Sequence, residues 1–245
     1  MISVIIPTLN EAERLPTLLA SLAVSIVEHE TIVADGNSTD GTADIAGERG
    51  ARVIRTEGGR GAQLRAGADA ARGEVLLFLH ADSRFPAGGL QAIERALADA
   101  EVMGGNFRLL FDGGDGFSDW LNGFYGWIRS HGVYYGDSAV FIRRRAYGAI
   151  GGVRPMALVE DFDLTRRMER LGRTVCIDDP PLVTSSRRFA GRRPAAIIAG
   201  WLMIHALYYL RLLSQAVASP PRLALRFGAP PRTASAVQRA DGHRL

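Results

Sequence analysis

The first hundred residues alternate between short apolar runs and longer segments with helical periodicity. The apolar runs are rich in β-branched residues and end at proline, glycine or polar turns, which predicts strands. The segments between them carry capping residues and glycine stops, which predicts helices. The predicted strands cover residues 3–8, 31–35, 51–56 and 74–80, and the predicted helices cover 15–27, 38–50, 61–72 and 86–100. Four alternations of strand and helix indicate βαβ units and a mostly parallel sheet.

The fourth predicted strand, "EVLLFLH", is an unbroken apolar run from Val75 to Leu79. Such a run is typical of a parallel strand that helices cover on both faces. It ends in His80-Ala81-Asp82, so a buried strand delivers an imidazole and a carboxylate at its carboxyl end.

The second half of the chain is less regular. It predicts strands over 104–111, 138–144 and 173–178, and helices over 159–172 and 195–217. The aromatic stretch between the first two of these strands reads as helix or loop. Its aromatic residues are interpreted either as core or as an acceptor site: Trp120, Phe124, Tyr125, Trp127, Tyr134 and Tyr135. We divide the chain into a domain at 1–190, an apolar helix at 191–217 and a Pro/Arg-rich tail at 218–245.

Composition narrows the function classes. Hydrophobic residues make up 47% of the 245 residues and charged residues 22%, as in an ordinary folded protein. The net charge of +3 comes from 29 basic and 26 acidic residues, which is too balanced to indicate nucleic-acid binding. The single cysteine, Cys176, and the absence of a secretory signal at the N-terminus predict a cytoplasmic protein.

The apolar helix raises the question of a membrane. Residues 195–210 carry no formal charge, but sixteen residues fall short of the roughly 20 that span a bilayer. We expect a helix that packs on the domain or lies on the membrane surface, where the arginines that follow it suit an anionic bilayer. A contact between two copies of the chain, giving a homodimer, is the third interpretation.

Polar residues gather where the predicted strands end. Asp35 ends the second strand, the third runs into Gly58-Gly59-Arg60-Gly61, and His80 and Asp82 end the fourth. In an open α/β sheet, ligands bind beyond the carboxyl ends of the strands. We therefore expect these sequence-distant groups to converge on one edge of the sheet.

Each group has a structural reading beside the functional one. Asp82 suits a Mg²⁺ or Mn²⁺ ion shared with substrate phosphates, and is otherwise a turn or capping residue. The glycine-rich turn suits an anion that Arg60 clamps, although such turns are common. Glu160 and Asp161 open a helix, where carboxylates are favoured electrostatically, and they also suit a general base.

Five segments together carry a family resemblance. "VIIPTLNEAERLP", "VADGNSTDGT", "FLHADSRFP", "GDSAVFIRR" and "VEDFDLTRRMERLG" occur in the order and spacing of family 2 inverting glycosyltransferases with the GT-A fold. The resemblance covers about residues 1–190, and within the family it is closest to the bacterial radical-SAM/selenodomain-associated transferases. It implies an α/β, GT-A (nucleotide-diphospho-sugar transferase) fold with flanking helices.

The resemblance also implies roles for individual residues. Asp161 is expected to be the catalytic base, with Glu160 assisting, and Asp82 to ligate the metal. Gly136 and Asp137 are expected to line the sugar or acceptor pocket, and Arg187 and Arg188 to form a phosphate-binding loop. The remaining donor-binding residues are Pro7, Asn10, Glu11, Asp35, Arg60, His80, Ala81 and Asp82.

One departure from the family pattern is His80, which stands where the first aspartate of Asp-X-Asp is usual. The site loses one negative charge, which predicts a lower metal affinity or a shift toward an imidazole-tolerant ion such as Mn²⁺. The alternative readings of His80 are a hydrogen bond to the ribose and a structural histidine. The expected partners are a nucleotide-sugar donor, such as a UDP-sugar, and a lipid-linked or small-molecule acceptor. The rival readings are a nucleotidyltransferase, which would want a glycine-rich basic loop after the first strand, and a non-catalytic protein that binds a nucleotide or a membrane.

Overall fold

The computed structural model describes residues 1–154, 156, 159–186 and 194–218, and the side chains of the last stretch as far as residue 210. The chain consists of two compact units, Met1–Ile204 and His205–Leu245. The expected tail from 219 onward lies outside the described residues, as do Arg187 and Arg188.

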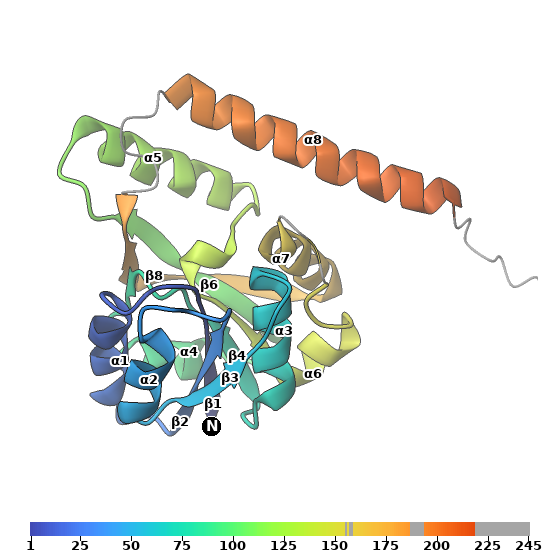
Figure 1. The fold of residues 1–245 in the computed structure, drawn as a ribbon. Coiled ribbons are helices and arrows are strands. Elements are labelled where there is room, and N and C mark those ends of the chain that lie inside the picture. The colour runs from blue at the N-terminus through green and yellow to red at the C-terminus, as the bar shows by residue number, and fades with distance from the viewer. Residues whose placement is uncertain (155, 157–158, 187–193, 219–245) are drawn as a thin grey trace, which may run out of the picture. The chain divides into compact units, whose positions relative to one another are not determined.

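The first unit alternates strands and helices from its first residues (Figure 1). The strands are β1 (Ile2–Thr8), β2 (His29–Asp35), β3 (Arg52–Arg55), β4 (Val75–Phe78), β5 (Ser83–Arg84), β6 (Val102–Phe111), β7 (Val140–Arg143) and β8 (Arg173–Thr184). The helices are α1 (Leu15–Ala23), α2 (Thr42–Glu48), α3 (Arg60–Ala70), α4 (Gly89–Ala96), α5 (Gly116–Ser130), α6 (Arg144–Ala149), α7 (Glu160–Leu171) and α8 (Pro194–Ala218), with a 3₁₀ turn, η1 (Gly136–Ser138).

Among the described residues, one sheet of eight strands runs in the order β3-β2-β1-β4-β7-β6-β8-β5. The first four strands of this order are parallel to one another, as the alternation predicts. Beyond β4 the sheet is mixed, because β7 is antiparallel to both β4 and β6, β8 is parallel to β6, and β5 is antiparallel to β8. The carboxyl ends of β1 to β4 therefore meet at one edge, which is where the predicted site residues stand.

Helices cover both faces of this sheet (Figure 1). Side chains of α1, α2, α4 and α5 belong to one buried cluster, and side chains of α3, α6 and α7 belong to the other. Alternate residues of β4 enter different clusters: Leu77 lies in the first, and Leu76 and Phe78 lie in the second. The unbroken apolar run of this strand follows directly from burial on both faces.

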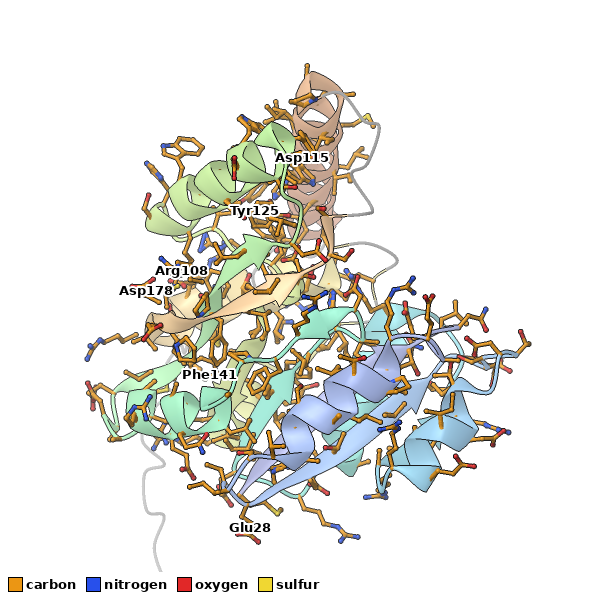
Figure 2. All side chains as sticks on the ribbon, turned by 90° about the vertical axis from the view of Figure 1, so that its left-hand side faces the viewer. Glu28, Arg108, Asp115, Tyr125, Phe141 and Asp178 are labelled. Atoms are coloured by element: carbon orange, nitrogen blue, oxygen red, sulfur yellow. The ribbon has the colours of Figure 1, made fainter. Side chains whose placement is uncertain are left out.

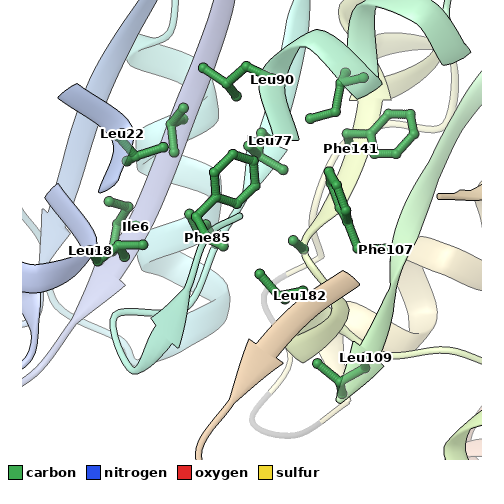
Figure 3. Packing of buried hydrophobic residues seen from close by; sticks show 14 of the residues in the cluster. Ile6, Leu18, Leu22, Leu77, Phe85, Leu90, Phe107, Leu109, Phe141 and Leu182 are labelled. Carbon is green, nitrogen blue, oxygen red and sulfur yellow. The ribbon is translucent and has the colours of Figure 1, made fainter. Parts of the chain in front are cut away.

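The first cluster reaches across the sheet to the second half of the chain. Phe107 of β6 makes edge contacts with Phe85 and Phe141 at centroid distances of 5.5 and 6.2 Å. Figure 3 shows these rings beside Leu77 and Leu182. Edge-to-face aromatic packing of this kind adds to the free energy gained by burial.

Most of the predicted elements are confirmed, with ends that shift by a few residues. The aromatic stretch, read as helix or loop, is the helix α5, which Asp115 caps by accepting a hydrogen bond from the Ser118 amide at 2.8 Å. The strand expected at 173–178 was drawn too short, since β8 continues to Thr184 through Pro180 and Pro181. The sequence analysis did not anticipate β5, η1 or α6.

Helix α8 has 25 residues, from Pro194 to Ala218. Within the part of the chain that the structure describes, neither this helix nor another is long and apolar enough to cross a membrane.

Candidate active site

Hydrogen bonds between backbone amides and side-chain oxygens join the loop that follows β1 to the loop that follows β2. The backbone amide of Asn10 donates to Ser38 Oγ at 2.9 Å, and its side-chain Oδ1 accepts from the amide of Thr39 at 2.9 Å. The Glu11 amide donates to Thr42 Oγ1 at 2.9 Å. The hydroxyls of the polar turn after β2 thus shape the neighbouring loop after β1.

Asp35 forms hydrogen bonds with residues next to both of these loops. It is fully buried at the end of β2, where it accepts hydrogen bonds from Thr8 Oγ1 at 3.2 Å and from the Ser38 amide at 3.0 Å. Ser38 Oγ donates to the same carboxylate. Buried carboxylates require such partners. Contact between Asp35 and a base or ribose stays a prediction.

A pocket of about 330 Å³ opens at the carboxyl ends of β1, β2 and β3. Gln63 of α3 forms part of its wall and donates from Nε2 to the Thr8 carbonyl at 2.7 Å. Sequence reasoning assigned no role to Gln63, although this residue lies only two positions after the glycine-rich turn. The pocket is lined by Pro7, Thr8, Leu9, Glu11, Gly36, Thr56, Glu57, Gly58, Gly59, Arg60 and Gln63.

Arg60, the first residue of α3, links the pocket to the acidic residues of α7. Its Nε donates to Glu160 Oε1, and its Nη2 lies 3.5 Å from Asp161 Oδ2. Glu160 is almost fully buried, whereas 41% of the Arg60 side chain is exposed. Burial lowers the pKa of the Arg60 guanidinium, but the charges of Asp161 and Glu160 outweigh burial and raise that pKa. The guanidinium is therefore a permanent cation between the pocket and the acidic pair.

Asp161 sits in the first turn of α7, where the helix dipole favours a carboxylate. Its Oδ2 accepts from the Gly136 amide at 2.8 Å, and its Oδ1 accepts from the Phe162 amide at 2.7 Å. A Cβ at position 136 would lie 2.9 Å from Asp161 Oδ2, so only glycine fits there. The structure thus brings together the predicted base and the predicted acceptor-pocket residues of η1.

His80 and Asp82 follow β4 and are both half-buried. Burial and the nearby Arg60 cation lower the pKa of His80, against the opposing charges of Asp137, Asp82 and Asp161. The imidazole is accordingly neutral near pH 7 and able to act as a ligand or as a hydrogen-bonding group. Because the charges of Arg60, Asp137 and Asp161 all act on His80, the segments after β3 and β4 lie near α7 and η1.

The donor set near Asp82 fits a metal only in part. No group of three or more His, Cys, Asp or Glu side chains able to hold a metal ion occurs among the described residues. One carboxylate with a neutral imidazole nearby fits a Mg²⁺ or Mn²⁺ ion whose other ligands are phosphate oxygens and waters. Ser83 and Arg84 pair with Thr184 and Val183, so the short strand β5 fixes the chain directly after Asp82.

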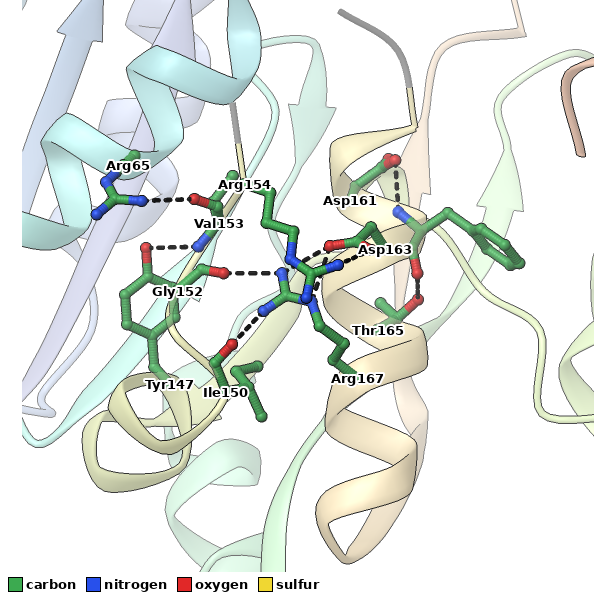
Figure 4. A network of polar contacts seen from close by, with 11 residues as sticks. Arg65, Tyr147, Ile150, Gly152, Val153, Arg154, Asp161, Asp163, Thr165 and Arg167 are labelled. Carbon is green, nitrogen blue, oxygen red and sulfur yellow. Dashed lines mark hydrogen bonds and ion pairs between the residues drawn. The ribbon is translucent and has the colours of Figure 1, made fainter. Parts of the chain in front are cut away.

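Asp163, in the same helix turn as Asp161, has a structural task. Its buried carboxylate forms ion pairs with Arg154 at 3.2 Å and Arg167 at 2.7 Å. Arg167 also donates to the carbonyl oxygens of Ile150 and Gly152, the latter at 2.8 Å. Figure 4 shows this network, which ties the start of α7 to the loop after α6.

A family model now bears on this arrangement. The model described as "Glycosyl transferase family 2" matches residues 3–147, more than half of the 245 residues. The chain belongs to glycosyl transferase family 2.

Two relatives agree with this membership. An uncharacterized glycosyltransferase of Mycobacterium tuberculosis is 37% identical over 109 residues, which are 44% of this chain and 49% of the relative. The chain thus matches about half the length of that relative. A PGL/p-HBAD biosynthesis glycosyltransferase of Mycobacterium bovis is 32% identical over 204 residues, which are 75% of this chain and 72% of the relative.

Solved structures share the fold of this family 2 chain. A mannosyltransferase from Pyrobaculum calidifontis, in complex with GDP-Man and Mn²⁺, has a TM-score of 0.65 at 20% identity, over 89% of this chain and 64% of its own. Glucosyl-3-phosphoglycerate synthase from Mycobacterium tuberculosis, in complex with Mn²⁺, UDP and glucosyl-3-phosphoglycerate, has a TM-score of 0.58 at 19% identity, over 81% of this chain and 75% of its own. The fold is therefore the expected α/β GT-A fold.

The Asp163 network generates a stability prediction. Asp163→Asn leaves the buried Arg167 guanidinium without its counter-charge, and should lower the free energy of unfolding by about 3 kcal/mol. Urea denaturation at pH 7 measures this change. The matched control is Asp69→Asn, which breaks an exposed pair with Arg65 at 3.8 Å and should cost less than about 0.5 kcal/mol. Equal losses in the two variants would mean that the network is not what holds α7.

Proposed function

We propose that this protein transfers a sugar from a nucleotide-diphosphate-sugar donor to an acceptor hydroxyl, with inversion at the anomeric carbon and with the help of a divalent metal ion. The observation that carries this proposal is the position of Asp161. Two backbone amides hold its carboxylate beside Arg60, at the edge of the sheet where the donor pocket opens.

The donor half of the proposal rests on the pocket beyond β1, β2 and β3. A cavity of about 330 Å³ suits a nucleoside, and Arg60 at its border suits the diphosphate. Arg60 then exchanges part of its contact with Glu160 and Asp161 for contact with phosphate oxygens. The solved relatives that carry GDP-Man or UDP together with Mn²⁺ agree with a donor of this class.

The metal is assigned to Asp82, with His80 beside it. When bound, a divalent ion neutralises charge on the diphosphate. The pairing of β5 with β8 holds the backbone next to Asp82 in place. The neutral imidazole of His80 adds no positive charge that would repel a cation.

The reaction itself is a single displacement. The Asp161 carboxylate takes the proton of the acceptor hydroxyl, and the acceptor oxygen forms a bond to the anomeric carbon. The bond from that carbon to the diphosphate breaks, and the nucleoside diphosphate leaves with the electron pair. Because attack and departure occur on opposite faces of the sugar, its configuration inverts. Glu160 assists by holding Arg60 next to the leaving group.

A nucleotidyltransferase is the less favoured function. Such an enzyme would need a glycine-rich basic loop after β1, whereas "LNEAERLP" occupies that position, with its amides bonded to the neighbouring loop. Membership of glycosyl transferase family 2 also favours sugar transfer.

The base assignment is tested by Asp161→Asn. The amide keeps the shape of the carboxylate but is not a base, so we expect the rate of UDP or GDP release from UDP-glucose, UDP-GlcNAc and GDP-mannose in the presence of alkyl glycoside acceptors to fall by about 10²–10⁴-fold. Donor affinity, measured by calorimetry on the same variant, should stay within about threefold. Near-normal release from a folded variant would assign the base elsewhere.

The metal assignment is tested by Asp82→Ala. For the unsubstituted protein we expect Mn²⁺ to tighten UDP or GDP binding at least about tenfold, because Asp82 would hold an ion that offsets the charge of the diphosphate. In the variant, calorimetry with and without Mn²⁺ should give the same affinity. An intact Mn²⁺ effect would place the ion away from Asp82. If neither nucleotide binds the unsubstituted protein, the non-catalytic reading of His80 replaces this proposal.

We further propose that α8 attaches the protein to the surface of an anionic membrane. Its residues 195–210 carry no charge, and large apolar side chains on it are between 46 and 67% exposed: Leu202, Met203, Leu207, Tyr209 and Leu210. Exposed apolar surface of this extent on a helix usually marks an interaction site. The sequence after residue 218 carries five arginines and one aspartate, which suits anionic headgroups.

Vesicle co-sedimentation tests this attachment. The protein should bind phosphatidylglycerol vesicles, and Leu207→Glu with Leu210→Glu should reduce the bound fraction about tenfold, because two charges enter the apolar face. The matched control, Val24→Glu with Ile26→Glu, changes exposed apolar residues elsewhere and should bind normally. Equal binding of both variants would contradict the proposal. A dimer in sizing experiments, with no vesicle binding, would assign α8 to a subunit contact instead.

A further inference from the structure

A second cavity, of about 230 Å³, lies between α5 and the strands β6 and β8. It does not share lining residues with the pocket at the strand ends. Figure 2 shows Tyr125 on α5 above Arg108 and Asp178, which stand on the two strands at the exposed side of this cavity. The proposed transfer reaction leaves this cavity unexplained.

The interior of the cavity is mostly apolar and aromatic. Phe107 and Leu109 of β6 are buried and contribute to its lining. The rings of Tyr125 and Tyr134 are also buried and belong to the wall. A cavity of this composition favours a ring or a branched hydrocarbon over a polyhydroxylated sugar.

One cation is built into this wall. Nε of Arg129 donates to Oδ1 of the buried Asn106 at 2.7 Å, and the guanidinium carbon lies 4.5 Å from the centre of the Tyr134 ring. Asn106 is in turn fixed by donation from Nδ2 to the Phe107 carbonyl at 2.9 Å. A guanidinium held by a hydrogen bond and an aromatic face is oriented in advance, which favours binding of a carboxylate.

Two titratable groups of the cavity, Cys176 and Tyr134, are neutral near pH 7. Burial and the nearby Asp178 raise the pKa of the Cys176 thiol, although Arg129 opposes this shift. Burial and Glu169 raise the pKa of the Tyr134 hydroxyl. Asp178 and Arg108 are both exposed at the rim, and the charge of Asp178 also acts on the Cys176 thiol. Arg129 is therefore the half-buried cation that the cavity wall offers to an anionic occupant.

The cavity touches the backbone that positions the proposed base. Ser138 of η1 lies in its lining, and the Tyr125 hydroxyl donates to Oδ2 of Asp137, the preceding residue, at 3.4 Å. The residue before that is Gly136, whose amide holds Asp161. An occupant packed against Tyr125 and Ser138 thus bears on the turn that carries this amide.

We propose that this cavity is a binding site for a small carboxylate with an apolar ring, with Arg129 pairing to the carboxylate and Tyr125 and Tyr134 enclosing the ring. This deepens the proposed function, because the occupant is either the acceptor itself or a ligand that adjusts η1 without being consumed. Binding at this site does not require sugar transfer, so the site can be tested separately.

The test is calorimetric titration of the full-length protein with 3-phenylpropionate and, as a neutral analogue, 3-phenylpropan-1-ol. The carboxylate should bind at least about tenfold more tightly than the alcohol, because a charge-assisted pair is lost in the alcohol. Arg129→Gln should remove this preference, while the matched rim variant Arg108→Gln should keep it. Failure of 3-phenylpropionate to bind at millimolar concentration, or equal effects of the two arginine variants, would overturn the proposal.

The variant Gly126→Leu on α5 tests whether 3-phenylpropionate binds in this cavity. A Cβ at this cavity-lining residue meets no atom within 4 Å, so the variant should fold and yet block the cavity. Loss of 3-phenylpropionate binding with unchanged UDP and GDP binding is the expected result, and retained binding would contradict this location.

A second experiment distinguishes an occupant that is the acceptor from one that is a regulatory ligand. 3-(4-Hydroxyphenyl)propionate supplied with UDP-glucose or GDP-mannose should become glycosylated if the occupant is the acceptor. If it is a regulator, both phenylpropionates should change the rate of UDP or GDP release without being consumed. Binding that yields neither product nor a rate change would overturn the link to η1, and failure of transfer with every acceptor would count against the proposed function alone.

Discussion

The pairing of β4 on both of its edges is the constraint on which the rest of the molecule depends. This four-residue strand is hydrogen-bonded to β1 on one side, in the parallel part of the sheet, and to β7 on the other, where the mixed part begins. Its side chains alternate between the two buried clusters. Because both edges and both faces are occupied, the chain leaves β4 at a fixed point, and His80 and Asp82 stand at that point.

The Arg60 guanidinium lies among the acidic groups around this point. Arg60 contacts Glu160 and Asp161, which are 100 and 101 positions away in the sequence, and its charge is also felt by His80. Buried or half-buried carboxylates repel one another, and a central guanidinium offsets that repulsion. It also leaves the acids available, since a phosphate group can compete for the same guanidinium. The arrangement therefore suits a site that alternates between an empty and an anion-bound condition.

The parallel half of the fold could be predicted from the sequence, because alternating strands and helices leave a strong local pattern. The convergence of Asp35, Arg60 and His80 followed from the rule that parallel strands end at one edge. What the pattern could not supply was long-range pairing: β5 has two residues and exists only because β8 continues through two prolines to meet it. Likewise, Asp161 and Asp163 look alike in sequence, and only the partners brought by Gly136 and Arg167 give them different tasks.

The hydrogen bonds between the loops that follow β1 and β2 limit which insertions and deletions the protein can accept. Surface loops usually tolerate inserted or deleted residues. Here four backbone amides, those of Asn10, Glu11, Ala12 and Thr39, are matched to side chains of the opposite loop. One added residue in either loop would shift every match beyond it. Lineages of this protein should therefore keep both loop lengths constant, or change them together, while residues between these anchors drift.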